Sequence, residues 1–556
     1  MTFPSRRKQM AERKKQNYMH GAAILTVGVI IMKVLGFFYK VPLKNILGNE
    51  GFGIFISAYN IYNIFFTLAT AGLPVALSRL VAEADAHGRV KQEEKTFRVA
   101  LATFAVMGVI FSLILYLFPN WLAASYLENP DAALSIRAMA PAILLVCIVS
   151  AYRGYCQGNG NMIPTTVDEV LEVLFKVIPG LIITSALVRA HKALPACSAG
   201  AMLGVATGSV VSLAYMIIYK HRHYDVLAAP FTAGKMAKGA QSEEEPTDSS
   251  AKIVRDLLVI GVPIALGASV LAILNSLDAK FCMNRLQRAA MFSYVDAKVL
   301  YGVYGSAQNF FNLPAALITP LTISIVPAIS GAFKRGARDE AAKISEDSMR
   351  ISAVIAMPMG VGLSVMSFPI MMGFYTDDHP AGPGLLAIMG VASFFVCMLL
   401  MENAVLQASG KEKYTMITMI VGGVVKIMVN WVLVAQREIN IYGAPIGTLI
   451  SYVVMCVMNF IFMSRQLERT PRLDRILAKP ALCSAVMGAS AWAVYGLASR
   501  VLIRTGRIGM LLAMLAAMAV AVVVYVVCIV FTSAVTKADL ELIPGGARIA
   551  TLLKMK

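Results

Sequence analysis

The fold of this chain is decided by the segment VIIMKVLGFFYKVPLKNILG (Val29–Gly48), which has the length and apolar character of a membrane span but carries cations. Lys33 lies near its middle, and Lys40 follows seven residues later. An ammonium group at the bilayer centre costs about 2.5–3.5 kcal/mol on insertion scales. Lysines retained at this depth predict a water-filled cavity or charged partners inside the protein.

The composition indicates a membrane protein throughout. Of the 556 residues, 58% are hydrophobic and only 15% are charged, with a mean hydropathy of +0.68. A soluble protein carries about 25% charged residues. Apolar runs of about 20 residues, each long enough to cross a bilayer, recur from end to end. Strand-like alternation is missing, which excludes a membrane barrel. We therefore expect an all-α polytopic membrane protein.

The apolar runs predict about fourteen transmembrane helices, arranged as two pseudo-symmetric six-helix lobes plus two C-terminal helices. The expected spans are 21–43, 53–78, 96–119, 132–152, 163–188, 196–219, 253–277, 299–328, 350–375, 383–406, 414–435, 443–463, 478–499 and 507–532. The predicted parts are a basic cytoplasmic N-terminus (1–20), an N-lobe (21–220), a cytoplasmic linker (221–252), a C-lobe (253–465), the last two spans (466–535) and a cytoplasmic tail (536–556).

The net charge of +18 is best explained as a topology signal. Lys and Arg concentrate in the loops on the N-terminal side, whereas the opposite loops FPNWLAASYLENPD and YTDDHPAGPG contain none. The positive-inside rule then places both termini in the cytoplasm of a multi-pass plasma membrane protein. Because the charge is dispersed over short loops, we expect membrane lipids as partners and no nucleic acid.

Several features repeat between the two predicted lobes. Gln157, Gly160 and Lys176 recur as Gln407, Gly410 and Lys426, each displaced by 250 residues. The predicted sixth helix opens with AGAMLG (199–204) and the twelfth with YGAPIG (442–447). Each lobe has an even number of spans, so the repeats are parallel. Transporters of this kind place substrate between the repeats near the midplane.

Polar groups at mid-depth are the candidate substrate-binding residues. Lys33, Lys176 and Lys426 all fall near the centres of their spans, where snorkelling to the interface is difficult. Polar stripes follow two further helices, one with Asn60 and Asn63 and the other with Gln308 and Asn312. A hydrated functional cavity and structural ion pairing are both compatible with this pattern. For Lys426 the candidate partners across helices are Asp278 and Glu402.

A second cluster combines one arginine with three acids. Glu172 precedes Lys176 by four residues, the spacing of a helical ion pair. Asp168 and Glu169 lie nearer the cytoplasmic end, where Arg153 of the preceding span is in position to meet them. This cluster is either a gate or coupling site, or a static network of salt bridges.

The sequence lacks the motifs of catalytic sites. It contains no G-x-S-x-G, no H-E-x-x-H and no phosphate-cradling loop, and the eight cysteines show no metal spacing. We expect a transporter and not an enzyme, with no metal and no cofactor. The coupling ion is left open between Na⁺ and H⁺.

Two motifs resemble those of a known family. GLPVALSRLVAEADAHGR (Gly72–Arg89), which includes Arg79, resembles the end-of-helix-two signature of polysaccharide-transporter and SpoVB-like proteins. KVLGFFYKVPLKNILG resembles the MurJ pattern S/T-R-V-L-G-F-x-R-D. Lys33 matches the first Arg of that pattern in charge, while Tyr39 replaces the second Arg and Lys40 replaces the acid. The likeness extends over nearly the whole chain, within the superfamily that also contains multidrug exporters.

This resemblance implies a flippase for a lipid-linked anionic glycan, with lipid II as the leading cargo and a lipid-tail groove on the last two helices. Arg79, Arg153, Asp168, Glu169 and Glu172 would then serve gating or coupling, and a monomer would suffice. A drug exporter of the same superfamily is the first alternative, although it would favour carboxylates over lysines in its cavity. A membrane glycosyltransferase is the second; Asp377, Asp378 and His379 are its candidate cluster.

Overall fold

The computed structural model describes residues 18–222, 247–376, 379–502 and 506–532. Within these ranges the chain forms helices joined by short turns and contains no strand. The predicted all-α fold class is therefore confirmed. Asp377, Asp378, the N-terminal residues 1–17, the tail from 533 and most of the predicted linker lie outside the described residues.

The chain divides into two compact units, each of which is described by itself. Unit 1 comprises the chain up to Tyr39 together with Ile54–Ser276, and unit 2 comprises Lys40–Gly53 together with the chain from Leu277. The expected boundary differed, since it placed residues 40–53 in the N-lobe and began the C-lobe at residue 253. The chain thus passes between units inside two long helices, α1 and α8.

Unit 1 is a bundle of helices around an apolar core that includes Leu77, Phe97, Tyr155 and Leu257. Its helices are α1 (Tyr18–Thr70, without 40–53), α2 (Leu73–Ala86), α3 (Val90–Leu117), α4 (Ala133–Gly158), α5 (Ile163–Arg189), α6 (Leu194–Arg222) and α8 (Ser250–Arg288, up to Ser276). A short π-helix (Trp121–Tyr126) and a 3₁₀ turn (Pro130–Ala132) join α3 to α4.

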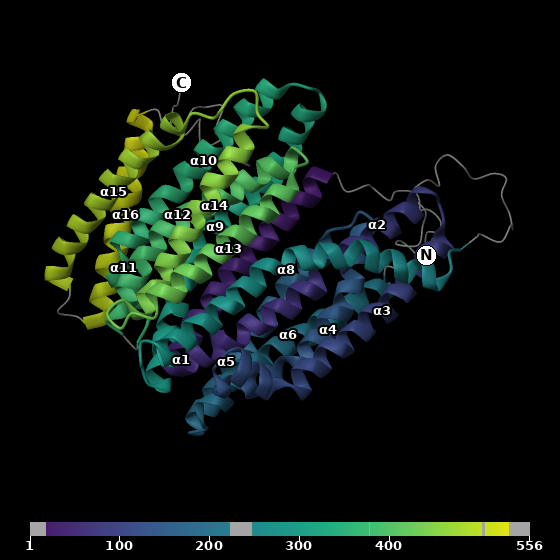
Figure 1. Ribbon diagram of the computed structural model, residues 1–556, viewed down its shortest axis with the longest axis horizontal. Helices are drawn as coiled ribbons and strands as arrows, with labels where there is room; N and C mark the ends of the chain where they lie inside the picture. The colour runs from purple at the N-terminus through teal and green to yellow at the C-terminus, as the bar shows by residue number, and fades with distance from the viewer. Residues whose placement is uncertain (1–17, 223–246, 377–378, 503–505, 533–556) are drawn as a thin grey trace, which may run out of the picture. The chain divides into compact units, whose positions relative to one another are not determined.

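Unit 2 has its own core, which includes Ile325, Met349, Met401 and Met455. Its helices are α9 (Tyr294–Lys334), α10 (Arg338–Val365), α11 (Ser367–Phe374), α12 (Ala381–Ala408), α13 (Glu412–Leu433), α14 (Gly443–Ser464), α15 (Leu473–Leu502) and α16 (Gly506–Thr532), together with the last part of α8. The last two helices, α15 and α16, lie side by side (Figure 1).

The expected spans map onto these helices with three differences at their ends. The loop expected between the first two spans is helical. Helix α1 departs from helical geometry only at Gly48 (φ 69°, ψ 179°), a backbone conformation that glycine adopts readily because it lacks a Cβ. The second span breaks before Pro74, whose missing N–H suits the first turn of α2. The span expected at 350–375 divides at Met366 into α10 and α11.

Large apolar side chains cover the outward faces of many of these helices. Among the described residues, twelve helices are long and apolar enough to cross a membrane, and the first of these, Ile31–Ala86, covers two expected spans. Exposed side chains include Val106 and Leu113 on α3 and Val522 and Phe531 on α16. Exposed apolar patches of this extent are suited to lipid contact. The chain is a multi-pass membrane protein.

The repeat inferred from the sequence has a structural counterpart. Gly160 lies two residues after α4 with a φ of 71°, and Gly410 lies two residues after α12 with the same value. In each turn the glycine N–H donates to the carbonyl of the matching glutamine, Gln157 or Gln407, at 2.9 and 3.0 Å. Identical turns 250 residues apart support a duplicated helical unit.

The sixth helix of each repeat packs a glycine against the lysine-bearing fifth helix. A Cβ on Gly204 of α6 would lie 2.4 Å from the Gly180 Cα and 2.8 Å from the carbonyl oxygen of Lys176. A Cβ on Gly447 of α14 would collide with the Asn430 side chain, close to the carbonyl oxygen of Lys426. The small residues therefore let the helix backbones approach closely at the level of the lysines.

Both ends of the predicted linker are fixed on α3. On one side, the Lys220 Nζ lies 3.4 Å from the Phe97 ring centroid and 3.5 Å from Glu94 Oε2. On the other side, Gln92 accepts the Asp248 N–H at 2.8 Å and donates to its carboxylate at 3.3 Å. The ends of this segment thus belong to unit 1, and they do not form a free tether between units.

Segment Lys40–Gly53 is held in unit 2 by polar contacts. The Asn45 side chain donates to the Phe374 carbonyl and accepts the Thr376 N–H, both at 2.9 Å. Glu50 pairs with the buried Lys298 at 2.8 Å. These contacts explain why the middle of α1 groups with unit 2, which no periodicity in the sequence indicates.

We predict that Gly204→Ala destabilises unit 1 by about 1–3 kcal/mol, the usual cost of overpacking. The added methyl group would meet backbone atoms of α5, which have no rotamer to escape into. Thermal unfolding of the purified protein in detergent measures the effect. Gly267→Ala is the matched control, because a Cβ there meets nothing within 4 Å. Equal melting temperatures for the two variants would contradict the packing argument.

Candidate functional site

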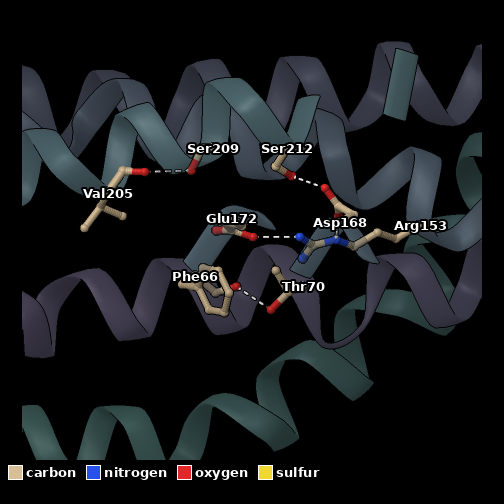
Figure 2. Close-up of polar contacts among 8 residues, drawn as sticks. All are labelled: Phe66, Thr70, Arg153, Asp168, Glu172, Val205, Ser209 and Ser212. Carbon is tan, nitrogen blue, oxygen red and sulfur yellow. Dashed lines mark hydrogen bonds and ion pairs between the residues drawn. The ribbon is translucent and has the colours of Figure 1, made fainter. Parts of the chain in front are cut away.

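The predicted cluster of one arginine and three acids is partly assembled in unit 1 (Figure 2). Arg153 of α4 donates from Nε to Asp168 and from Nη2 to Glu172, both at 2.6 Å. Asp168 and Glu172 are one turn apart on α5, so one guanidinium spans both. Ser212 of α6 donates to the second Asp168 oxygen at 2.5 Å. This network joins three helices through buried, charge-assisted hydrogen bonds.

The expected pairing of Glu172 with Lys176 is not formed. Glu172 is bound by Arg153, whose planar guanidinium forms a geometrically defined hydrogen bond. Within the described ranges, the side chains of Lys176 and Glu169 are partly buried and have neither a hydrogen bond nor an ion pair. The arginine therefore neutralises two of the three acids, leaving one lysine and one acid of α5 uncommitted.

Lys33 can be placed relative to this network from two packing contacts of α1. A Cβ on Gly28 would collide with Thr166, near the start of α5. Further along, the Tyr39 hydroxyl lies beside Gly180 of α5 and donates to the Ala201 carbonyl at 3.2 Å. Helices α1 and α5 therefore run parallel. A rise of about 1.5 Å per residue places Lys33 level with Glu172.

The α1 face that bears Lys33 is open. The Lys33 side chain is exposed, and among the described residues no acid pairs with it. A Cβ on Gly36, one turn later, would meet nothing within 4 Å. A cation on a membrane-spanning helix thus has room for a ligand beside it.

The other predicted residues of unit 1 occupy varied surroundings. Tyr39 is buried and bonded to α6, so it contributes packing. Asn60 and Asn63 are partly buried on α1, and the nearby Thr67 hydroxyl donates to the Asn63 carbonyl at 2.7 Å. Arg79 is exposed on α2. The polar stripe is therefore partly satisfied within its own helix.

Lys40, Gln308, Asn312 and Lys426 belong to unit 2. Lys40 and Gln308 are partly buried, and Asn312 is exposed and donates to the Gln308 carbonyl at 2.8 Å. The structure therefore places the predicted substrate-binding residues in two sets, one in each unit.

Lys426 is neutralised by one of its two predicted partners. Its Nζ lies 2.9 Å from Asp278 Oδ2, and Asn430 donates to the other Asp278 oxygen. The Tyr304 hydroxyl also donates to Asp278, at 3.4 Å. Helices α8, α9 and α13 therefore meet at one buried carboxylate. Because Asp278 already compensates it, Lys426 would need to leave this pair to bind an anion.

Two further buried lysines, Lys44 and Lys298, are not among the predicted site residues. Lys298 pairs with Glu50, and the Lys44 Nζ lies 4.8 Å from the Tyr375 ring centroid. Their partners are distant in sequence, so helical spacing gives no signal for them. Within the described ranges no group of three or more His, Cys, Asp or Glu could hold a metal ion.

Two repeated helical units with charged groups at membrane depth define a protein of the secondary-transporter class. The comparisons identify the family. The model of the polysaccharide biosynthesis protein family matches residues 18–333, more than half of the chain, and the chain belongs to this family. The model of the MatE family matches residues 288–432.

Curated relatives and solved structures agree with this assignment. The chain is 24% identical over 463 residues to the lipid II flippase MurJ of Bacillus subtilis (strain 168), covering 80% of this chain and 82% of the relative. It is 25% identical to stage V sporulation protein B of the same organism, covering 82% and 85%. A structure titled "Lipid II flippase MurJ, inward closed conformation" superimposes with a TM-score of 0.67 at 14% identity, covering 91% and 98%. The chain is thus a transporter similar to the MurJ and SpoVB proteins.

We predict that Asp278→Asn destabilises unit 2 by about 3–5 kcal/mol, because it leaves the Lys426 ammonium buried and unpaired. Thermal unfolding in detergent measures the loss, and the double variant Asp278→Asn/Lys426→Met should recover most of it. Asp474→Asn, which breaks the exposed pair with Arg472, is the control, with an expected loss below about 1 kcal/mol. A double variant no more stable than Asp278→Asn would refute the charge argument.

Proposed function

We propose that this protein moves a polyprenyl-pyrophosphate-linked saccharide from the cytoplasmic to the outer leaflet, with lipid II or a related cell-wall precursor as its cargo. The observation that carries the proposal is the contrast between Lys33 and the paired cations of the membrane-spanning helices. Arg153 and Lys426 have carboxylate partners, whereas Lys33 is exposed and unpaired among the described residues. Lysine binds phosphate as a point charge. An available cation at membrane depth suits an anionic headgroup.

The surroundings of Lys33 agree with such a ligand. Gly36 leaves space beside it, and Lys176 adds an uncommitted ammonium on the parallel helix α5. The amide side chains Asn60 and Asn63 offer hydrogen bonds to sugar hydroxyls. The polyprenyl tail would remain in lipid, with α15 and α16 as its guide. The names of the curated relatives, a lipid II flippase and a sporulation protein, suggest the same class of cargo.

The membrane potential favours this direction of transport. Because the inside of the membrane is negative, moving two negative charges outward is downhill by roughly 4–5 kcal/mol per 100 mV. Return of an empty, cationic site is favoured by the same field. We place both termini in the cytoplasm of the plasma membrane, on the charge distribution of the loops. One chain contains both repeats, so a monomer suffices for alternating access.

We predict that Lys33→Ala slows transport of fluorescent lipid II across reconstituted vesicles by about ten- to a hundredfold. That range corresponds to a charge-assisted hydrogen bond of about 1.5–3 kcal/mol. Lys33→Arg should retain most of the rate, because it keeps the charge. The assay measures accessibility of the probe to a reductant outside the vesicle.

Lys192→Ala is the control for this experiment, since it removes an exposed lysine from the turn after α5. Undiminished transport by Lys33→Ala would remove Lys33 from the mechanism. Efflux of an organic cation such as ethidium, without movement of the lipid probe, would identify a drug exporter instead.

A further inference from the structure

Glu402 of α12 is a buried acid to which the structure gives no counter-charge. Its side chain is only 3% exposed, and its Oε2 atom has no hydrogen-bond partner. The sequence nominated it as a partner of Lys426, but that lysine is bound to Asp278. Among the described residues, no cationic side chain pairs with Glu402. It therefore differs from Asp168 and Asp278, which are equally buried and are compensated.

The surroundings of Glu402 are mainly apolar. Its neighbours along α12, Met401 and Val405, belong to the apolar core of unit 2, which also includes Ile325 and Ile329 of α9. The Cys456 thiol of α14 is within hydrogen-bonding range of its carboxyl and also donates to the Phe395 carbonyl at 3.1 Å. The amides of the next residue along, Asn403, and of α14 Asn459 bond to each other at 2.7 Å. The nearby polar groups therefore supply no positive charge.

The charged groups on the neighbouring helix α10 are engaged elsewhere. Ser352 of α10 donates to the Cys397 carbonyl at 3.4 Å, and the two helices are antiparallel, so Asp347 lies level with Glu402. Asp347 pairs with Arg350 at 2.8 Å. Glu346 lies near Arg472, which precedes α15. Helix α13, which also contacts α12, contributes Tyr414 to this core.

An ionised carboxylate in such surroundings would be costly, because an unpaired charge in an apolar interior is destabilising by several kcal/mol. A neutral carboxylic acid avoids most of this cost and can donate its own hydrogen. The fold itself does not require an acid here, because the 250-residue repeat places Tyr152 at the equivalent position of unit 1. Glu402 lies six residues before α12 ends at Ala408, or about 9 Å along the axis. A proton would thus have a short path to the helix end.

We propose that Glu402 is a proton-binding site, and that its protonation and release couple inward proton movement to outward cargo movement. The coupling rests on the proposed function. The proton-binding step itself does not. A proton arriving from outside neutralises the carboxylate and permits the apolar packing of unit 2. Release of the proton toward the cytoplasm requires water to reach Glu402, which happens only when the packing of α12 against α9, α10 and α14 opens.

The test uses the full chain reconstituted in phosphatidylethanolamine–phosphatidylglycerol vesicles with fluorescent lipid II. Potassium and valinomycin hold the membrane potential at zero while a pH difference is imposed, acidic on the side corresponding to the cell exterior. One proton exchanged per cargo shifts the leaflet distribution of the probe about tenfold per pH unit. We expect this shift in the wild type and none in Glu402→Gln. Glu346→Gln, which changes another buried acid, should keep the full shift.

Infrared spectroscopy of the same samples reports on the proton without any transport. The carbonyl band of a protonated carboxylic acid should be present in the wild type and in Glu346→Gln, and reduced in Glu402→Gln. If the wild type does not move lipid II, the proposed function fails, and the infrared result alone decides the proton site. A full pH response in Glu402→Gln, a wild type that moves lipid II without responding to pH, or an infrared band unaffected by Glu402→Gln would each overturn the proposal.

Discussion

The buried ion pairs impose the main constraint on this structure, because an apolar helix bundle accepts a charge only beside its opposite. Arg153 satisfies it by binding Asp168 and Glu172, and Lys426 satisfies it by binding Asp278. Each pair spans different helices, so compensation of charge also fixes which helices meet. The first network joins α4, α5 and α6, and the second joins α8, α9 and α13. Five of the predicted charged residues therefore also join helices within each unit: Arg153, Asp168 and Glu172 in unit 1, and Asp278 and Lys426 in unit 2.

The second constraint comes from the continuity of the chain between the two units. The chain passes between the units at Tyr39/Lys40, Gly53/Ile54 and Ser276/Leu277, and each crossing lies inside a helix. The segment that looks like a linker is instead clasped at both ends by α3 through Gln92 and Glu94. Any change in the relation of the units must accordingly be accommodated by α1 and α8.

The sequence was sufficient to predict the class, the approximate spans and the repeat, because each depends on local hydropathy or on residues at a fixed spacing. The equivalent turns at Gly160 and Gly410 bear this out. Helix ends were less predictable where tertiary contacts decide them. Residues 40–53 form part of unit 2 because Asn45 binds the backbone around Phe374, more than 300 positions away. No window of sequence contains that information.

The ion pairs of the candidate site were also only partly predictable from the sequence. The sequence correctly grouped Arg153 with Asp168 and offered Asp278 as a partner for Lys426, since oppositely charged groups at similar depth tend to meet. It wrongly paired Glu172 with Lys176, because the observed pairing with Arg153 depends on the approach of α4 to α5. Nor could it distinguish Asp278 from Glu402, a choice that depends on which helix faces α13. The arrangement of the helices, and not the composition of the chain, decides which charged side chains remain unpaired.

The unpaired charges of unit 1 are the basis for proposing an anionic cargo. Arg153, Lys33 and Lys176 are matched in number by Asp168, Glu169 and Glu172, so net charge alone would favour neither an anion nor a cation. Placement breaks this symmetry, because Asp168 and Glu172 are buried and bound by Arg153, whereas Lys33 is exposed. A ligand approaching the open face of α1 therefore meets an ammonium before it meets a carboxylate. The proposed preference for an anionic cargo therefore rests on which charged side chains the helices bury and which they leave exposed.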